Sequence, residues 1–444
     1  MKLGILFSGG KDSNYATYLM SKNNFDIKSL ISMISKNPES YMFQTPGNNF
    51  IKYQSNCLNI PLLEYKTKGK KEEELKDLKL AIQKSIKNYQ IDAIVSGAIK
   101  SIYQASRIQK ICADLNIWCF NPLWQIDEKT FLKQLIEEKF VIIIIGIFSY
   151  PFTSKYLGKI LTTNLYDELV ELENKYQINP AGEGGELETF VIDAPNFNKK
   201  IKILESKKNM DSENSGILNI QKFKLINKTQ IKTIDVETNT LYNNLNLINI
   251  KKSLNTNNST NNLILIISSC KYKIHENEFI RPITNILLKL NKQYEIIHYL
   301  DLPKFDKIKL ENYSKIIISG TALKDNDYLE YLFNFKVLNK INTPILGICA
   351  GYQILGLING CKLIKNQEIG FTETRIIKKS YFFEIGDYKT YSLHNNSLKL
   401  NSNFEIFAIT KNSEQIIKLK NKEIYGFLFH LEITNIQLLI NFIK

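Results

Sequence analysis

The sequence predicts an α/β protein with two doubly wound, mainly parallel-sheet domains. Short apolar runs alternate with amphipathic segments over residues 1–205, and the same alternation resumes in the C-terminal part. Between them lies LNTNNSTNN, which is polar, turn-prone and has nothing to bury. Strands that alternate with helices form parallel sheets covered by those helices. The expected domains are residues 1–228 and 262–444, joined by a linker over 229–261.

The expected strands of the first domain are apolar runs, namely KLGILF, IKSLISMI, AIVSGA and FVIIIIGIF. The last run is apolar throughout, which predicts a parallel strand buried on both faces. It is far shorter than the ~20 residues that span a bilayer, so no membrane segment is expected. Amphipathic segments over residues 72–89 and 102–115 predict covering helices. Residues 215–228 predict one or two more strands at the edge of the domain.

The second domain begins with a clean strand pattern at LILIIS (263–268). Further strands are expected at YEIIHYL, KIIISG and PILGIC, followed by shorter β-like pieces through EIYGFLFHLE. No short-period repeat is visible.

Composition excludes some classes of protein and favours others. The 444 residues carry a formal net charge of +14. The lysines are scattered and do not cluster on one element, so nucleic acid is not an expected partner, whereas an acidic protein partner is compatible. The six cysteines form no C-x-x-C pair, which favours a reducing, cytoplasmic setting. The N-terminus starts a strand at once, so no signal peptide is expected.

A polar turn separates the first strand from a helical pattern. It consists of Ser8, Gly9, Gly10, Lys11, Asp12 and Ser13. The two glycines let backbone N–H groups approach an anion, and the helix that follows points its positive end the same way. The serines add hydroxyl donors and the lysine adds a charge. A carboxylate next to phosphates is explained if Asp12 holds Mg²⁺, which bridges to them.

The turn S-G-G-x-D-S resembles the pyrophosphate loop of the ATP pyrophosphatase superfamily. This resemblance implies an adenine-nucleotide alpha-hydrolase-like domain that binds ATP and splits it into AMP and pyrophosphate. Gly97 and Ala98 stand at the end of another expected strand, where small side chains leave room for a nucleotide ring.

Five further motifs narrow the resemblance. They are PESYMF (38–43), GKKEEEL (69–75), SGAIKSIYQASRIQ (96–109), NPLWQID (121–127) and NPAGEGGELETFVIDAP (179–195). In this order they resemble the diphthine–ammonia ligase family, with Gln44 in place of an expected histidine. The resemblance implies that diphthine on elongation factor 2 is the acceptor. Carboxylates can bind the trimethylammonium group of diphthine, and Glu183, Glu186 and Glu188 are the candidates.

The second domain contains a candidate nucleophile. In PILGICAGYQILG, Cys349 stands between two glycines after an apolar strand, as in the sharp strand-to-helix turn that exposes a nucleophile. The helix that follows favours the thiolate. GFLFHLE supplies His430 as the base, and Glu432 two residues later is expected on the same face of a strand, where it orients the imidazole.

This pattern resembles class I glutamine amidotransferases, which implies a flavodoxin-like fold and glutamine as substrate. Gln353 matches the glutamine-binding position, and Gly320 and Thr321 match the oxyanion position, where a second glycine is common. The donor is a backbone N–H, so the threonine is compatible with function. Ala350 follows the nucleophile. His394 is a further candidate for the glutamine pocket.

Together the two halves predict an enzyme that uses ATP to activate the diphthine carboxylate as an acyl-adenylate. Glutamine hydrolysis supplies the ammonia, and a passage between the domains would keep it from bulk water. Two alternatives stay open: an ATP-dependent amide ligase acting on a small metabolite or a tRNA base, and a non-catalytic protein that senses ATP and glutamine.

Overall fold

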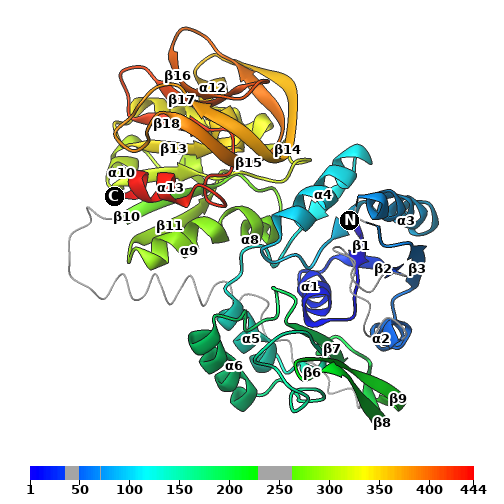
Figure 1. Ribbon diagram of the computed structural model, residues 1–444. Helices are drawn as coiled ribbons and strands as arrows, with labels where there is room; N and C mark the ends of the chain where they lie inside the picture. The colour runs from blue at the N-terminus through cyan, green and yellow to red at the C-terminus, as the bar shows by residue number, and fades with distance from the viewer. Residues whose placement is uncertain (36–49, 71, 229–262) are drawn as a thin grey trace. The chain divides into compact units, whose positions relative to one another are not determined.

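The computed structural model describes residues 1–35, 50–70, 72–228 and 263–444, and the chain forms two compact units, Met1–Val236 and Glu237–Lys444 (Figure 1). The predicted linker lies outside the described residues, and so do PESYMF and Gln44. The predicted domain limits therefore stay predictions. Within the described residues, every helix is too short or too polar to cross a membrane.

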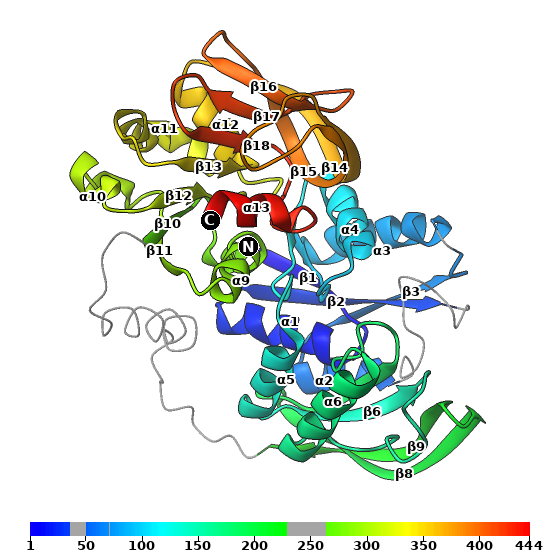
Figure 2. The same cartoon turned by 60° about the vertical axis from the view of Figure 1, so that its left-hand side comes forward.

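A five-stranded parallel sheet forms the centre of the first unit, with the strand order β3-β2-β1-β4-β5. Helix α1 contacts β1 and β2 of this sheet and helix α3 contacts β2 and β3, and α1 also contacts the second sheet of the unit (Figure 2). The elements are β1 (Lys2–Leu6), α1 (Lys11–Lys22), β2 (Asp26–Ser35), α2 (Ile51–Leu58), β3 (Leu62–Thr67), α3 (Glu73–Tyr89), β4 (Ala93–Val95), α4 (Ile102–Asp114) and β5 (Trp118–Phe120).

The second sheet of this unit is antiparallel, with the order β7-β6-β9-β8. The strands of this sheet and the helices along the same stretch of chain are α5 (Glu128–Glu137), β6 (Val141–Ile147), α6 (Thr163–Tyr176), β7 (Leu187–Asp193), β8 (Lys199–Ser212) and β9 (Ser215–Asn227). The prediction of a parallel strand at FVIIIIGIF was therefore wrong: β6 pairs antiparallel with both neighbours. An unbroken apolar run shows that both faces are buried, but it carries no information on strand direction. The strand expected within 215–228 is present as β9, although it lies inside the sheet.

The second unit is built on one nine-stranded sheet, β11-β10-β12-β13-β18-β17-β16-β14-β15. The first five strands in this order are parallel and the rest are antiparallel. The strands are β10 (Leu263–Ser268), β11 (Gln293–His298), β12 (Lys315–Ile318), β13 (Ile345–Ile348), β14 (Lys362–Ile376), β15 (Gly386–Lys399), β16 (Phe404–Ile409), β17 (Glu414–Leu419) and β18 (Ile424–Phe427). The α/β class and the doubly wound parallel sheets are confirmed, and each unit adds antiparallel strands.

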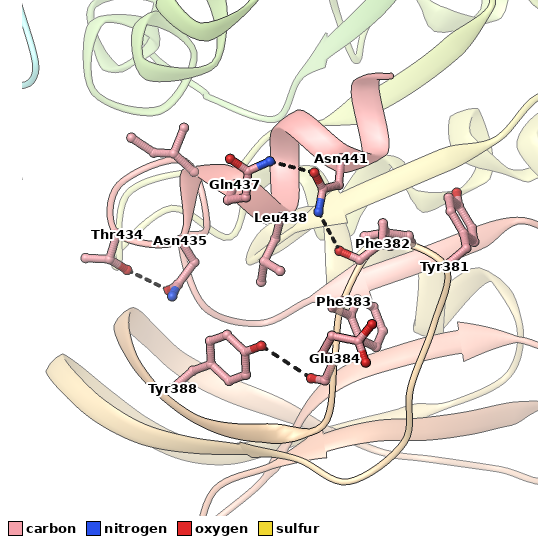
Figure 3. Close-up of a pocket in the computed structure, with 11 residues that line it drawn as sticks. Tyr381, Phe382, Phe383, Glu384, Tyr388, Thr434, Asn435, Gln437, Leu438 and Asn441 are labelled. Atoms are coloured by element: carbon pink, nitrogen blue, oxygen red, sulfur yellow. Dashed lines mark hydrogen bonds between the residues drawn. The ribbon is translucent and has the colours of Figure 1, made fainter.

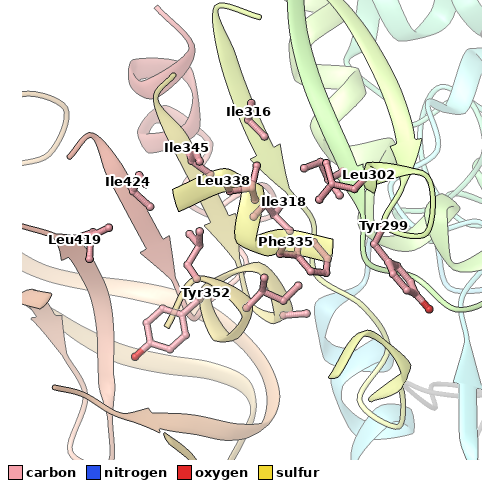
Figure 4. Packing of buried hydrophobic residues seen from close by; sticks show 14 of the residues in the cluster. Tyr299, Leu302, Ile316, Ile318, Phe335, Leu338, Ile345, Tyr352, Leu419 and Ile424 are labelled. Atoms are coloured by element: carbon pink, nitrogen blue, oxygen red, sulfur yellow. The ribbon is translucent and has the colours of Figure 1, made fainter. Parts of the chain in front are cut away.

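Helices cover both faces of the parallel part of this sheet. They are α8 (Glu276–Phe279), α9 (Arg281–Lys289), α10 (Lys307–Glu311), α11 (Leu332–Phe335), α12 (Ala350–Ile358) and α13 (Ile436–Ile443). One buried cluster joins the strands to α10, α11 and α12 through side chains such as Leu310, Phe335 and Tyr352. Phe335 and Tyr352 are labelled in Figure 4. The other joins them to α9 and α13 through Ile283, Leu287 and Phe442. The loops that carry chemistry extend from the ends of strands held between these two layers.

A buried pair of hydroxyls links β2 to α3 in the first unit and yields a stability prediction. The Oγ atoms of Ser29 and Ser85 are 2.7 Å apart, and both residues are 0% exposed. Ser29→Ala leaves the Ser85 hydroxyl buried without this partner, so we expect the free energy of unfolding to fall by about 1–3 kcal/mol. The double change to alanine should cost less than the sum of the two single changes, because neither hydroxyl is then orphaned.

The free energy of unfolding is measured by urea unfolding, with tryptophan fluorescence as the signal. The two tryptophans of the chain, Trp118 and Trp124, both lie in the first unit. Additive effects of the single changes would contradict the prediction.

Candidate functional site

The loop between β1 and α1 is held by hydrogen bonds to its carbonyl groups. The Asn14 side chain donates from Nδ2 to the carbonyl oxygens of Gly9 and Gly10, each at 3.0 Å. From α2, the Nε2 of Gln54 donates to the Gly9 oxygen at 2.9 Å. Gly9 has a φ of +81°, which favours glycine. The loop therefore keeps one shape in which its carbonyls are engaged by the protein and α1 begins at Lys11.

The segment after β4 lies against the first turn of α1. A Cβ atom at Gly97 would stand 3.0 Å from the Asp12 carbonyl carbon and 3.1 Å from the Ser13 nitrogen. The Ala98 N–H donates to Ser96 Oγ at 3.1 Å. The structure thus brings Gly97 to the predicted phosphate loop, whereas the contact of Ala98 is with Ser96.

Two carboxylates share one buried ammonium group at this loop. Lys11 Nζ lies 2.9 Å from Asp12 Oδ1 and 3.5 Å from Glu183 Oε1. Burial by itself lowers the pKa of Lys11, but the two carboxylates outweigh it and the net shift is upward. Burial, followed by the charge of Asp12, raises the pKa of Glu183 to about 7. The cluster tolerates its second negative charge poorly, so a cation would stabilise it.

These residues fit a magnesium–nucleotide complex. Mg²⁺ is usually held by one or two carboxylates together with phosphate oxygens and water. Asp12 and Glu183 supply two carboxylates, and within the described residues no group of three or more acidic, histidine or cysteine side chains could hold a metal. Asp12 would then be the principal protein ligand, as the sequence predicts, and phosphates would complete the shell.

The other two predicted carboxylates lie apart from Lys11. Glu186 Oε1 accepts a hydrogen bond from the Asn179 N–H at 3.2 Å. Glu188 lies on β7, its Oε2 is buried and makes no hydrogen bond to the described residues, and burial raises its pKa to about 8. Of the three, Glu183 is the one that contacts the loop. Their assignment to the acceptor substrate stays a prediction.

Two contacts at this loop were not predicted from the sequence. Gln54 holds the Gly9 carbonyl, and Thr189 Oγ1 accepts from the Lys11 N–H at 3.2 Å. Thr189 belongs to the motif NPAGEGGELETFVIDAP, which also contains the three carboxylates. Gln54 stands in an ordinary amphipathic helix, with no local pattern to mark it.

Cys349 forms the turn between β13 and α12. Its backbone has φ +50° and ψ −99°, a strained conformation for a residue with a side chain. Its N–H donates to the Phe427 carbonyl at 2.7 Å, and its Sγ donates to the Leu393 carbonyl at 3.4 Å. The strained turn is thus tied to the neighbouring strand β18 and to β15. The sharp strand-to-helix turn expected from the sequence is present, Cys349 in it is 4% exposed, and its role as a nucleophile stays a prediction.

His430 and Glu432 pair as predicted, although not on a strand. Strand β18 ends at Phe427, and both residues lie in the loop that follows. Alternation along a strand is therefore the wrong reason for their contact; the loop folds His430 Nδ1 to within 2.7 Å of Glu432 Oε1. Burial alone lowers the pKa of His430, but Glu432 and Cys349 outweigh it and hold that pKa well above its ordinary value. The pair favours a charged imidazolium.

Gly320 brings the histidine and the cysteine to one point. A Cβ atom at Gly320 would lie 2.7 Å from His430 Cε1 and 3.4 Å from Cys349 Cβ. The imidazole Nε2 is buried and makes no hydrogen bond to the described part of the chain. The imidazole and the thiol side chain therefore lie in the same small space, close enough for Cys349 to contribute to the raised pKa of His430.

The remaining predicted positions surround this point. Thr321 follows Gly320, and its Oγ1 donates to Asp325 Oδ2 at 2.6 Å. Ala350 is the first residue of α12, so its N–H has no acceptor within the helix. Gln353 accepts from the Tyr328 hydroxyl and donates from Nε2 to the Asn396 carbonyl at 2.9 Å. In this structure the Gln353 amide is engaged by the protein, so its predicted contact with glutamine stays a prediction.

His394 is part of a separate buried network. Its Nε2 lies 3.1 Å from Glu368 Oε2 and its Nδ1 lies 3.1 Å from the Asn366 carbonyl. Burial opposes the charge of Glu368, but its bonds to His394 and other donors prevail and lower its pKa. Both ring nitrogens of His394 are thus engaged in the β14–β15 ribbon.

A surface pocket of about 460 Å³ lies elsewhere in the second unit (Figure 3). The segment 381–388 and the start of α13 line it, and Asn441 donates from Nδ2 to the Phe382 carbonyl at 3.0 Å. None of the predicted catalytic residues is among its lining residues.

Comparisons with known proteins follow the division into two units. The chain matches the family models Diphthamide synthase N-terminal domain over residues 1–118 and Diphthamide synthase C-terminal domain over residues 127–226. It matches Glutamine amidotransferase class-I over residues 274–438.

Three curated relatives are similar to parts of the chain. A mouse protein named Diphthine–ammonia ligase is 30% identical over 261 residues, which cover 54% of this chain and 97% of the mouse protein. Its namesake in Schizosaccharomyces pombe is 30% identical over 217 residues, 45% of this chain and 36% of that protein. The glutamine-hydrolyzing GMP synthase of Aquifex aeolicus is 32% identical over 177 residues, 37% of this chain and 34% of that protein. The match thus spans most of the mouse relative but about a third of the other two.

Glu188 makes the stability of the first unit depend on pH. Its pKa of about 8 in the folded chain exceeds the ordinary 4.5 of an exposed side chain. The folded chain holds a proton that the unfolded chain releases, so stability should fall as pH rises from about 5 to about 8. Glu188→Gln should reduce this decline, as measured by urea unfolding and tryptophan fluorescence at several pH values. Glu64→Gln, an exposed change on β3, serves as the control, and an equal decline in all three proteins would contradict the assignment.

Glu432 is expected to control the charge of His430. Without the carboxylate, burial dominates, so Glu432→Gln should lower the pKa of His430 strongly. The chain has four histidines, so an NMR titration gives few signals, and the signal that His430→Ala lacks identifies the ring. Glu423→Gln, at an exposed position just before β18, should leave that pKa in place. An unchanged titration in Glu432→Gln would refute the pairing.

Proposed function

This chain belongs to the diphthine–ammonia ligase family, and on that premise we propose that it converts diphthine on elongation factor 2 into diphthamide, using ATP and glutamine. One observation carries the proposal: a loop suited to nucleotide phosphates and a Cys–His–Glu arrangement occur in the same polypeptide. Making an amide from a carboxylate requires activation of the carboxyl group and a supply of nitrogen, and each arrangement suits one of these tasks.

The first unit is proposed to activate the carboxylate. The phosphates of ATP would lie at residues 8–13, where the start of α1 favours anions. The diphthine carboxylate attacks the α-phosphorus, and pyrophosphate leaves. Ammonia then attacks the acyl carbon of the adenylate, loses a proton, and AMP leaves as the amide forms. Mg²⁺ held by Asp12 and the phosphates would offset the charge of the pyrophosphate.

The second unit is proposed to release ammonia from glutamine. The Cys349 thiolate attacks the side-chain amide carbon, and backbone N–H groups near Gly320, Thr321 and Ala350 stabilise the oxyanion. The His430 imidazolium gives its proton to the departing nitrogen, and Glu432 keeps the ring oriented and charged. Water, deprotonated by the now neutral ring, hydrolyses the thioester and frees glutamate.

The proposed partners follow from this chemistry. Elongation factor 2 bearing diphthine is the macromolecular substrate, and glutamine is the nitrogen donor. The net charge of +14 suits an acidic protein surface. A cytoplasmic location, predicted from the cysteine content, is part of the proposal.

Substitution of the nucleophile separates the two reactions. Cys349→Ala should abolish glutamine-dependent amidation because no thioester can form. It should retain amidation with ammonium chloride, because the first unit is unaltered. The assay uses purified full-length protein, ATP and diphthine-bearing elongation factor 2, with mass spectrometry of the modified histidine.

The control is Cys361→Ala, a change at a buried cysteine of the same unit that lies in the hydrophobic cluster beside α12. The assigned route would be contradicted if folded Cys349→Ala lost amidation with both glutamine and ammonium chloride, or kept amidation with both. AMP formation without elongation factor 2 but with a small metabolite or a tRNA would favour the alternative ligase.

A further inference from the structure

The peptide group between Gly320 and Thr321 is held from its carbonyl side. The Gly320 oxygen accepts from Ser319 Oγ at 2.9 Å and from Cys270 Sγ at 3.7 Å. The carbonyl of one residue and the N–H of the next belong to the same planar group and point in opposite directions. These two donors therefore fix the direction of the Thr321 N–H.

Thr321 is also held through its side chain. Asp325 is 3% exposed, and its Oδ2 accepts from Thr321 Oγ1 at 2.6 Å and from the Lys271 N–H at 2.8 Å. Its Oδ1 accepts from the Asp327 N–H at 3.1 Å. Because two backbone groups hold the carboxylate, it is a fixed anchor that ties Thr321 to the loop after β10.

The position of this peptide matters because Gly320 lies against both reacting groups. A small shift of the loop would move the Thr321 N–H relative to Cys349, since no side chain at Gly320 separates the loop from His430 or Cys349. Loss of one oxyanion donor commonly costs about 10²–10³-fold in kcat.

We propose that Asp325 is a positioning residue for glutamine hydrolysis: through the Thr321 hydroxyl it holds the 320–321 peptide so that the Thr321 N–H donates to the oxyanion. This inference rests on the proposed function of the second unit. It also gives a role to Thr321, which stands at a position where a second glycine is common in amidotransferases of this class.

The test compares Thr321→Val with Thr321→Ser in the full-length chain. Valine keeps the shape but removes the hydroxyl, so kcat for glutamate release should fall about 10–100-fold, with KM changed less than about twofold. Serine keeps the hydroxyl and should recover kcat to within about threefold of the parent. Asp325→Asn should lower kcat like valine. The double variant Thr321→Val with Asp325→Asn should have a kcat no lower than that of either single variant, because both changes disrupt the same hydrogen bond.

A second readout separates positioning from a damaged nucleophile. Alkylation of Cys349 by iodoacetamide displaces iodide at a saturated carbon and needs no oxyanion donor, so its rate should stay within about twofold of the parent. Mass spectrometry of the Cys349 peptide follows it.

Three results would overturn the inference: an unchanged kcat in Thr321→Val, an equal loss in Thr321→Ser, or a parallel fall in alkylation. If Asp325→Asn does not fold, the valine and serine variants decide. A parent protein that uses ammonium but not glutamine would instead overturn the proposed function of the unit.

Discussion

Parallel pairing of neighbouring strands is the constraint on which both sites depend. In the first unit β1 and β4 run in register, so the loop at residues 8–13 and the segment at Gly97 leave the sheet at the same edge. In the second unit β12, β13 and β18 are parallel neighbours, and each is followed by one part of the candidate glutaminase site. Residues far apart in the sequence meet because the carboxyl ends of parallel strands share an edge.

Both sites bury charge and offset it with a near partner. Lys11 faces Asp12 and Glu183, and His430 faces Glu432. Desolvation opposes the charged forms of Lys11, Glu183 and His430, so each of these charges depends on the group beside it. Glu183 shows the limit of this compensation, because one ammonium cannot fully stabilise two carboxylates. In the proposed reaction, the unbalanced charge is where a cation that accompanies the nucleotide would contribute.

The two cysteines near the second site illustrate how environment separates chemical roles. Burial raises the pKa of the Cys270 thiol well above its ordinary value, which suits a neutral donor to the Gly320 carbonyl. Cys349 is also buried, but it lies in a strained turn beside the His430 imidazole. Sequence spacing distinguishes them because only Cys349 is flanked by glycines after a strand.

Much of the fold could be predicted because periodicity and turn chemistry are local. The strands β1, β4, β10, β12 and β13 lie within the expected apolar runs, and the helices at α3 and α4 match to within a residue or so. Strand direction could not be predicted at β6, since its buried run is equally suited to either pairing. The site residues were recognisable where a motif is contiguous, as at residues 8–13. Gln54 and Asp325 were not, because their roles arise from contacts across the fold.

The unusual backbone at Cys349 has a consequence for how this protein can be studied. A residue with a side chain keeps φ +50° only while β18 and β15 hold its amide and its sulfur. If those strands separated, the turn would relax, and the proposed glutaminase site would be inactive although the sequence is unchanged. Glutaminase turnover, once established, would therefore serve as a conformational reporter for refolding, crowding or chaperone experiments on the C-terminal half.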